Sequence, residues 1–425
     1  MLKEIIKKNK VLYYPCKYIK NVLDRLKYQR SLNYISKNTQ KVRKKILNNE
    51  ILNIVFIIQY IPGWNKIEPV YNKMLKDSRF NPIIVCVPFN IQNNKLMDNN
   101  GNDTFDYFIN HGYQAINALT GNACWYDLKK LKPDYIFHSR PYNHFMPKNY
   151  TSKKIVKYAL ICNIMYGANF SLNEQDVTLN EDYYKNVYMF FCFDKGEQEF
   201  YSKRFKFGIS KGIQKVLPYG AIGLEQILKS EIKYEDRSFD KTILWTPRWS
   251  TDKYIGGSNF FNYRDVILNI ANEYKNIKFI FRPHPLMFDN FIKTGELSIK
   301  EVEVFKKYIN SQPNLELNES KEYSDLFWRS DFIITDLSGI VPEYFVTNKP
   351  IIYCHSDASF NYLEYSKAII DSSYSVFNSE QLIDTIIMLI NNKDIKKIQR
   401  QNIINKYFSN VENNSENILE SLLTI

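Results

Sequence analysis

The sequence IKFIFRPHP, residues 277–285, joins a run of apolar residues to an arginine and a histidine that are each followed by a proline. The run has the length and composition of a strand buried on both faces. Because the prolines restrict the backbone on either side of His284, we expect Arg282 and His284 to point in fixed directions at the strand's end. Arginine clamps phosphate through paired N–H donors, and histidine donates a hydrogen bond or exchanges a proton near neutral pH. The stretch predicts an anion site, against the alternative of a turn with two solvated polar residues.

Similar apolar runs alternate with segments of helical spacing along most of the chain. This alternation is typical of parallel sheets built from strand–helix–strand units. We therefore predict an α/β fold class with two doubly wound domains, at residues 49–228 and 241–395, that face a cleft. A polar linker at 229–240 separates the domains, and a helical segment at 396–425 follows them. The clearest runs are ILNIVFIIQY at 51–60, NPIIVCVPF at 81–89, PDYIFHS at 133–139, ALICNIMYG at 159–167, VYMFFCF at 187–193 and PIIYCH at 350–355.

A second strand of the later domain ends in TDLSG, residues 335–339. In open α/β sheets, ligands bind beyond the carboxyl ends of the strands, where the free N–H groups at helix starts attract anions. Ser338 and Gly339 supply a hydroxyl and a backbone without a side chain at the start of the next helix. This turn therefore predicts a phosphate site beside Arg282 and His284.

The composition of the 425-residue chain, with 44% hydrophobic residues and only 14 glycines, is that of a well-packed globular protein. No apolar run approaches the ~18 residues of a membrane span, and the start lacks a signal peptide, so we expect a cytoplasmic protein. The six cysteines are scattered without a Cys-x-x-Cys pair. Cys86, Cys162, Cys192 and Cys354 lie in apolar runs, which predicts core packing and not metal or redox chemistry.

The formal charge of +12 is concentrated in residues 1–50, which contain fourteen Lys or Arg and only three acidic residues. Residues 1–48 form a basic arm with apolar residues near helical spacing, and Pro15 predicts a break or kink. Such a helix binds an anionic membrane surface, which we assign to residues 1–45. The alternative is a basic helix packed on the first domain. Nucleic acid is not expected as a partner, because the neutral body carries no RNA- or DNA-binding motif.

Three ordered motifs resemble the bacterial CDP-glycerol glycerophosphotransferases, which build teichoic acids and related capsular polymers. They are RPHP at 282–285, EYSDLFWRSDFIITD at 322–336 and TDLSGIVPEYF at 335–345. The resemblance implies a GT-B fold in which the donor pyrophosphate is engaged by Arg282 and His284. It further implies phosphate binding by Ser338 and Gly339, a donor-facing Glu343, and a pocket shaped by Asp336 and Asp325.

Two segments depart from the family's pattern. The family's first domain presents His-Gly-Thr-Pro, whose histidine is held to be the catalytic base, whereas this chain has MYGANFS at 165–171. Tyr166 then replaces the histidine and is a poor base at neutral pH. His138 and His144, in IFHSRPYNHF at 136–145, are the alternative bases or else surface or cap residues. The family's Pro-Thr-x-Arg segment appears as TPRWS, where Arg248 is displaced but still predicted to reach a phosphate.

The resemblance implies transfer of glycerol phosphate, or a related alditol phosphate, from a CDP-alditol to a hydroxyl of a lipid-linked polymer acceptor. CMP is the leaving group, and the reaction takes place at the inner face of the cell membrane. No Asp-x-Asp motif is present to hold a metal, so we expect no metal or cofactor and assign charge neutralisation to Arg282, Arg248 and the helix dipole. Two alternatives remain open: a GT-B glycosyltransferase that uses a UDP- or GDP-sugar, and an inactive nucleotide-binding scaffold of a polymer-synthesis complex.

Overall fold

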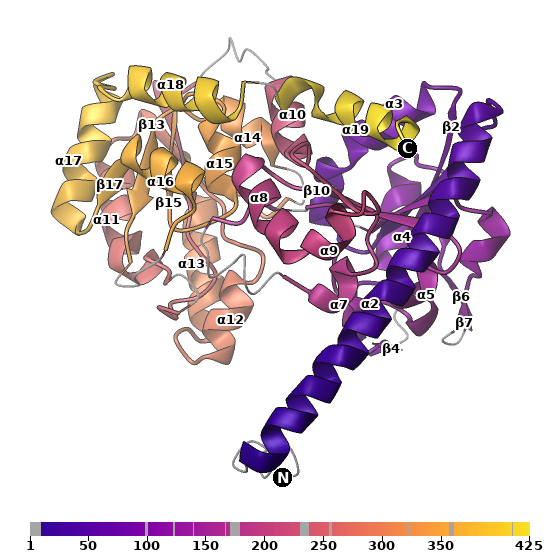
Figure 1. Ribbon diagram of the computed structural model, residues 1–425. Helices are drawn as coiled ribbons and strands as arrows, with labels where there is room; N and C mark the ends of the chain where they lie inside the picture. The colour runs from indigo at the N-terminus through magenta and orange to yellow at the C-terminus, as the bar shows by residue number, and fades with distance from the viewer. Residues whose placement is uncertain are drawn as a thin grey trace. The chain divides into compact units, whose positions relative to one another are not determined.

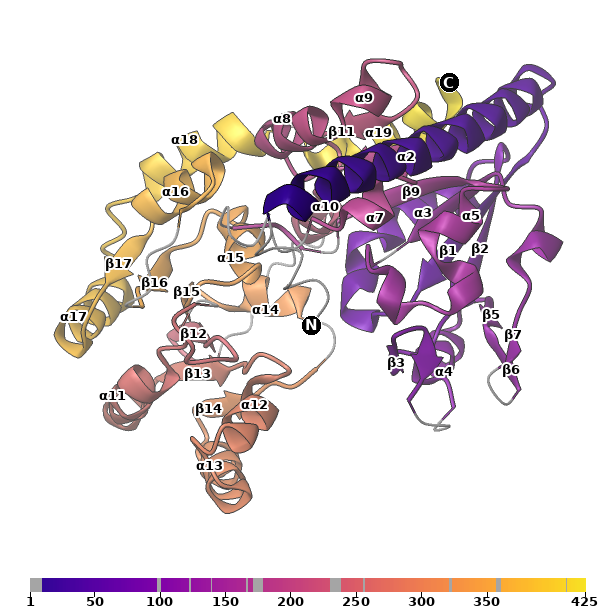
Figure 2. The same cartoon turned by 60° about the horizontal axis from the view of Figure 1, so that its bottom comes forward.

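The chain folds into two compact units in the computed structural model (Figures 1 and 2). The first unit comprises Met1–Tyr166, Leu179–Gly220 and Ser415–Ile425, and the second comprises Gly167–Thr178 and Ala221–Asn414. The structure describes residues 10–97, 101–121, 124–138, 140–165, 167–170, 179–229, 238–254, 257–320, 323–356, 361–409 and 411–425. The predicted linker at 229–240 lies largely outside these described residues.

The first unit contains a seven-stranded parallel sheet with the strand order β11-β10-β9-β8-β1-β2-β5. The chain builds outward from β1 in one direction and then returns to β8 on its other side, so the topological switch point lies between β1 and β8. The strands are β1 (Leu52–Ile58), β2 (Phe80–Cys86), β5 (Ala115–Asn117), β8 (Tyr135–His138), β9 (Leu160–Ile164), β10 (Met189–Phe191) and β11 (Lys215–Leu217). Two short antiparallel hairpins, β3–β4 (Ile91–Gln92, Lys95–Leu96) and β6–β7 (Leu119–Gly121, Cys124–Trp125), complete the strands described in this unit.

Burial on both faces explains why these apolar runs form central strands. Ile54 to Ile58 of β1 are each 0% exposed, and Phe56 stacks on Phe137 of β8 with ring centres 4.9 Å apart. Helices surround the sheet: α3 (Glu68–Leu75), α4 (Asp103–Asn110), α5 (Ser152–Ile155), α7 (Glu181–Tyr184), α8 (Lys195–Arg204), α9 (Lys206–Ile209) and the short turns η1 (Ile61–Lys66), η2 (Leu128–Leu131), η3 (Asn143–Phe145) and η4 (Lys148–Tyr150).

The second unit contains a six-stranded parallel sheet with the order β14-β13-β12-β15-β16-β17, and its switch point lies between β12 and β15. Its strands are β12 (Lys241–Thr246), β13 (Ile277–Phe281), β14 (Leu315–Leu317), β15 (Phe332–Thr335), β16 (Ile351–Cys354) and β17 (Tyr374–Val376). Its helices are α10 (Ile222–Lys229), α11 (Phe260–Glu273), α12 (Met287–Lys293), α13 (Ile299–Ser311), α14 (Ser324–Arg329), α15 (Ile340–Phe345), α16 (Glu364–Asp371), α17 (Ser379–Ile390), α18 (Lys397–Tyr407) and the turn η5 (Val411–Asn413). The predicted pair of doubly wound parallel-sheet domains is confirmed.

The predicted arm is one helix, α2 (Lys10–Leu47), which passes through Pro15 without a break. Its later part packs on the first unit, because Tyr28, Leu32, Ile35 and Val42 recur on one face and are at most 9% exposed. The alternative of a basic helix packed on the first unit therefore holds for this later part. Earlier in the helix, Tyr18, Ile19, Val22, Leu23 and Leu26 are exposed.

The C-terminal helix α19 (Asn414–Leu423) packs in the first unit, although the residues before it belong to the second. Tyr135 of β8 is buried and its hydroxyl donates to the carbonyl of Leu422 (2.7 Å). Lys73 forms an ion pair with Glu416 (2.7 Å). The last residues of the chain thus complete the packing of the first sheet.

The cysteines at 86, 162, 192 and 354 are buried and free, as predicted. None of the described helices is both long and apolar enough to cross a membrane.

Candidate active site

Arg282 follows β13 and is buried, with 9% of its surface exposed. Its backbone N–H donates to the carbonyl of Trp245 on β12 (2.9 Å), which extends the sheet by one residue. Its guanidinium donates to Asn318 Oδ1 (2.5 Å) and to the carbonyl of Ser320 (2.9 Å), and lies 4.7 Å from the centre of the Tyr323 ring. These three partners are uncharged, and their contacts orient the guanidinium.

His284 lies two residues beyond Arg282, and its ring centre is 6.3 Å from that of Trp249. The backbone N–H of Leu286 donates to His284 Nδ1 (3.1 Å), so the neutral ring carries its proton on Nε2. Burial, followed by the positive charges of Arg248 and Arg282, lowers the pKa of His284 to about 4. At pH 7 the ring is therefore a neutral Nε2–H donor beside two cations.

Asp336 joins three segments at the switch point of the second sheet and is 2% exposed. It accepts hydrogen bonds from the backbone N–H groups of Arg248 (2.8 Å) and Asn259 (3.2 Å) and from Asn259 Nδ2 (3.0 Å). Burial raises the pKa of its carboxyl, and these hydrogen bonds oppose that rise. The guanidinium of Arg248 in turn donates to the carbonyl of Leu337 (2.5 Å). Asp336 therefore holds the backbone of Arg248 beside the turn that follows β15.

Ser338 and Gly339 form that turn, and Gly339 is exposed at the start of α15. The hydroxyl oxygen of Ser338 accepts a long hydrogen bond from the N–H of Ile340 (3.4 Å). A Cβ at Gly339 would lie 4.0 Å from the carbonyl oxygen of Ala168, which is ordinary contact. Ala168, from the segment that departs from the family's pattern, thus lies beside the predicted phosphate turn within the second unit.

Glu343 is 6% exposed and accepts a hydrogen bond from the hydroxyl of Tyr323 (2.8 Å). Because the ring of Tyr323 also lies under Arg282, Glu343 holds Tyr323 in the position that supports the guanidinium. Asp325 is placed differently, since its half-exposed side chain forms an ion pair with Arg329 (3.6 Å) along α14.

The candidate bases of the first unit differ in exposure. His138 ends β8 and is 1% exposed, and neither of its ring nitrogens has a hydrogen-bond partner among the described residues. Burial lowers its pKa to about 3. His144 is exposed in η3, where its ring centre lies 4.0 Å from that of Phe145. Tyr166 lies outside the described residues.

The structure thus brings together most of the predicted donor-side residues at the carboxyl ends of the strands of the second sheet. Three residues that the sequence did not single out for the site position this group: Asn318, Asn259 and Tyr323. In the described part of the chain, no group of three or more His, Cys, Asp or Glu side chains is placed to hold a metal ion.

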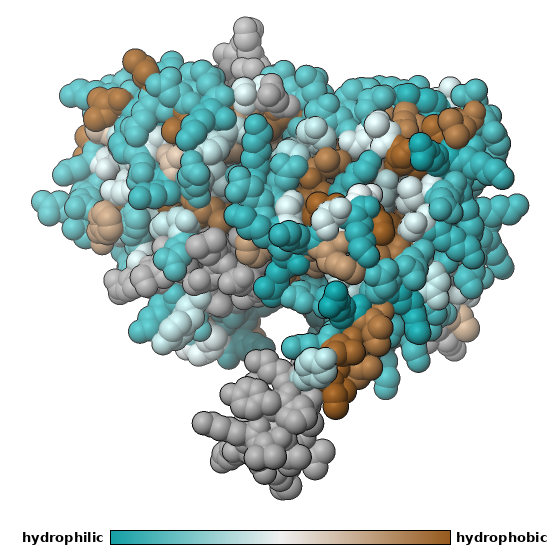
Figure 3. Space-filling view, viewed as in Figure 1, coloured by the Kyte–Doolittle hydropathy of each residue, from teal (hydrophilic) through white to brown (hydrophobic). Residues whose placement is uncertain are grey.

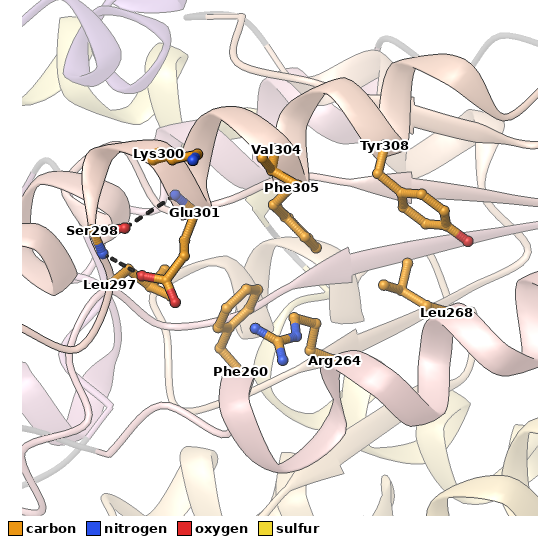
Figure 4. Close-up of a pocket in the computed structure, with 10 residues that line it drawn as sticks. All are labelled: Phe260, Arg264, Leu268, Leu297, Ser298, Lys300, Glu301, Val304, Phe305 and Tyr308. Atoms are coloured by element: carbon orange, nitrogen blue, oxygen red, sulfur yellow. Dashed lines mark hydrogen bonds between the residues drawn. The ribbon is translucent and has the colours of Figure 1, made fainter.

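A separate pocket of about 500 Å³ lies between α11 and α13 of the second unit (Figure 4). Three of its polar members are engaged locally, since Ser298 and Glu301 form the capping box that begins α13 (2.7 and 3.2 Å) and Arg264 pairs with Asp265 (2.8 Å). The pocket shares no lining residue with the predicted donor site. It is lined by Phe260, Arg264, Leu268, Leu297, Ser298, Lys300, Glu301, Val304, Phe305 and Tyr308.

Residues 229–424 match the family described as CDP-Glycerol:Poly(glycerophosphate) glycerophosphotransferase. Among solved structures, the chain is similar to a UDP-GlcNAc 2-epimerase from Neisseria meningitidis bound to UDP-GlcNAc, at 14% identity over 88% of this chain and 100% of that chain, with a TM-score of 0.58. It is also similar to S. aureus MnaA in a co-structure with UDP, at 15% identity over 87% of this chain and 95% of that one, with a TM-score of 0.55.

A variant of the wall teichoic acid polymerase TagF, soaked with CDPG, is similar at 13% identity over 97% of both chains, with a TM-score of 0.53. No curated protein matches the chain significantly. At these identities the structural likenesses show the fold, and the predicted GT-B-like class is confirmed. The resemblance drawn from the three sequence motifs is confirmed by the family match.

Proposed function

We propose that this chain transfers glycerol phosphate, or a related alditol phosphate, from a CDP-alditol, because its residues 229–424 match the CDP-glycerol glycerophosphotransferase family. The acceptor is a hydroxyl of a lipid-linked cell-surface polymer of the teichoic acid or capsule type, and CMP is released. The arrangement of Arg248, Arg282 and His284 carries this proposal. Two guanidinium groups and a neutral N–H donor meet at the edge of the sheet where a pyrophosphate would bind.

The reaction is a displacement at phosphorus. The acceptor hydroxyl oxygen forms a bond to the phosphorus that carries the alditol, the bond to the bridging oxygen breaks, and CMP leaves with that oxygen. The hydroxyl proton passes to a base. Such a step depends mainly on positioning and on neutralising charge, and Arg282 is well placed for both because its uncharged partners already fix its direction. His284 donates its Nε2–H to an oxygen of the pyrophosphate.

The base belongs to the first unit in this proposal, with His144, His138 and Tyr166 as candidates. His144 is favoured because it is exposed, whereas burial of His138 separates its ring from solvent. His138 is the last residue of β8, and His144 lies in η3 of the segment that follows this strand.

The decisive experiment identifies the nucleotide that is released. Purified protein is incubated with CDP-glycerol, CDP-ribitol and a panel of UDP- and GDP-sugars, together with a short glycerol phosphate oligomer as acceptor. We expect CMP. Release of UDP or GDP would replace the proposal with sugar transfer, and donor binding without release of any nucleotide would indicate the inactive scaffold.

Arg264→Met is the matched control for Arg282→Met in this assay. Arg264 belongs to the same unit, but its guanidinium pairs with the exposed neighbour Asp265 (2.8 Å). We expect the control to release CMP at the wild-type rate and Arg282→Met to release little.

We further propose that the first part of α2 binds an anionic membrane surface and places the enzyme at the cytoplasmic face of the cell membrane. Tyr18, Ile19, Val22, Leu23 and Leu26 are 40–71% exposed and form an apolar patch on this part of the helix (Figure 3). Nine Lys or Arg lie within residues 1–30. Apolar side chains beside many cations suit a helix that lies at the boundary between lipid headgroups and acyl chains.

Vesicle sedimentation tests this placement. Full-length protein should sediment with anionic vesicles at low salt and dissociate as salt screens the charges. The triple change Ile19→Ser, Leu23→Ser and Leu26→Ser should abolish sedimentation. As a control, Ile395→Ser with Ile398→Ser alters two apolar residues that are 79% and 78% exposed in the second unit, and should have no effect.

A truncation should end at residue 26, because Leu32, Ile35 and Val42 are core residues and removal of residues 1–45 would expose the sheet beneath them. Equal sedimentation by the shortened and full-length proteins would refute the membrane role.

A further inference from the structure

The Arg-Pro pair that follows a strand in the second unit occurs again in the first. Arg140-Pro141 follows β8 as Arg282-Pro283 follows β13, with one residue between β8 and its arginine. The side-chain contacts of the two arginines also correspond. Each guanidinium donates to the oxygen of a side-chain amide, Gln59 Oε1 (3.2 Å) for Arg140 and Asn318 Oδ1 (2.5 Å) for Arg282. Each also lies over an aromatic ring.

Gln59 is a buried residue whose side-chain amide is fixed by its own hydrogen bonds and accepts one from Arg140. It follows β1 and is 0% exposed, and its Nε2 donates to the carbonyls of Pro88 (3.0 Å) and Phe145 (2.6 Å). These two donations fix the amide plane, so Oε1 points at the guanidinium. The amide thereby joins the ends of β1, β2 and β8 around one arginine.

Aromatic rings surround the same guanidinium. Its Cζ lies 4.4 Å from the centre of the Phe145 ring, 5.1 Å from that of Phe89 and 5.9 Å from that of Tyr142. Phe89 is 48% exposed and Tyr142 is half-buried, so apolar ring surface accompanies the cation to the protein surface. These rings and Gln59 are uncharged, and they orient the guanidinium.

The loop that carries this cluster is held firmly in place. Asn94, in the β3–β4 turn, donates through Nδ2 to the carbonyls of Asn143 (2.7 Å) and Met146 (2.6 Å), and its backbone N–H donates to the carbonyl of His144 (3.0 Å). The rim of the cluster is therefore formed before any ligand arrives.

The cluster lies at the carboxyl ends of the strands beside the topological switch point, where open α/β sheets bind ligands. Gln59 follows β1 and Arg140 follows β8, which are the two strands at the topological switch point of the first sheet. In the second sheet, Arg248 and Asp336 follow the corresponding pair of strands, β12 and β15.

We propose that Arg140 binds a phosphate group of the acceptor chain, and that Phe89 and Tyr142 pack against the polyol or sugar next to that phosphate. Arginine held by a neutral amide has paired N–H donors suited to a phosphodiester or phosphomonoester. Because this assignment names the acceptor group recognised by the enzyme, it rests on the proposed function. Gln59 is a positioning residue that acts through Arg140.

Isothermal titration of a short glycerol phosphate oligomer, without donor, tests the proposal directly. Arg140→Met should weaken binding of the oligomer at least 10-fold. The affinity of Arg140→Lys should lie between those of Arg140→Met and wild type, because lysine keeps the positive charge but lacks the paired N–H donors of the guanidinium. Binding to wild type should weaken as salt rises, and this dependence should be reduced in Arg140→Met. Arg282→Met should change oligomer affinity less than 2-fold while it weakens binding of CDP-glycerol.

Two further variants separate recognition from folding. Phe89→Ala removes a half-exposed ring and should weaken oligomer binding a few-fold without changing the unfolding midpoint. Gln59→Leu should reduce oligomer binding and leave CDP-glycerol binding unchanged. Wild-type affinity in a folded Arg140→Met protein, or no oligomer binding by wild type, would overturn the assignment. If the oligomer binds through Arg140 but no CDP-alditol releases CMP, the proposed donor is wrong and the phosphate site stands.

Discussion

Replacing Arg282 with alanine should abolish most turnover while leaving the fold intact. A preorganised donor at a site of developing charge contributes roughly 2.7–4 kcal/mol, which is about 10²- to 10³-fold in rate. Arg282 meets the requirement of preorganisation because Asn318, Ser320 and Tyr323 fix its guanidinium. Arg282→Lys should retain an intermediate rate, since the charge remains but the paired donors are lost.

The cost of Arg282→Ala to stability should be small. The change leaves Asn318 Oδ1 and the carbonyl of Ser320 without this donor, and Asn318 is half-buried while Ser320 is exposed. Water can therefore replace the arginine, and the loss should lie near the low end of the range for an unsatisfied group, about 1 kcal/mol.

Two measurements decide the outcome: the rate of CMP release at saturating donor, and the midpoint of urea unfolding. A folded Arg282→Ala protein that turns over within threefold of wild type would place the donor site elsewhere. A large loss of stability would instead show that Arg282 is mainly a structural residue.

Three further predictions concern the residues around Arg282 and the base. Ser338→Ala and Glu343→Ala should each weaken binding of CDP-glycerol in calorimetric titrations, and unchanged affinity in both would argue against the turn before α15 as the phosphate site. His284 has a pKa of about 4 in the folded protein against an ordinary value of 6.5, so below pH 6.5 the unfolded chain takes up a proton that the native chain does not. Lowering the pH from 6.5 towards 4 should therefore reduce the free energy of unfolding by up to about 1.4 kcal/mol per pH unit, and urea titrations of His284→Asn should lack this contribution. His144→Ala should abolish turnover with donor binding intact; retained activity would pass the role of base to another residue or to the donor phosphate itself.

The strands of both sheets could be predicted because their signal is local. Continuous apolar runs such as residues 51–60 and 277–281 have the composition of strands covered on both faces, and they form β1 and β13. The function of α2 could not be settled in this way, because an apolar stripe on a basic helix suits both a lipid surface and a protein core. Only the structure shows that Leu32 and Ile35 are buried whereas Ile19 is exposed.

The grouping of the proposed donor-side residues was predictable in outline because strand ends, prolines and helix starts mark these residues along the sequence. Its internal contacts were not, since they join segments far apart in the chain. Asn259 and Asp336 are 77 residues apart, and nothing in the local sequence of Asn259 indicates that it holds a carboxylate. Tyr323 and Glu343 are 20 residues apart, and their hydrogen bond shows that Glu343 acts on a neighbouring side chain.

The chain passes between the units at four places, after residues 166, 178, 220 and 414, and the last of these passages returns α19 to the first unit. Cutting the chain at Gly220 would not yield two complete halves. The leading half would lack the carbonyl of Leu422 that accepts from buried Tyr135 and the acidic residue that pairs with Lys73. The trailing half would lack the carbonyl of Phe170 that accepts from the N–H of Leu363. Co-expression of the two pieces should therefore recover protein that neither piece yields alone.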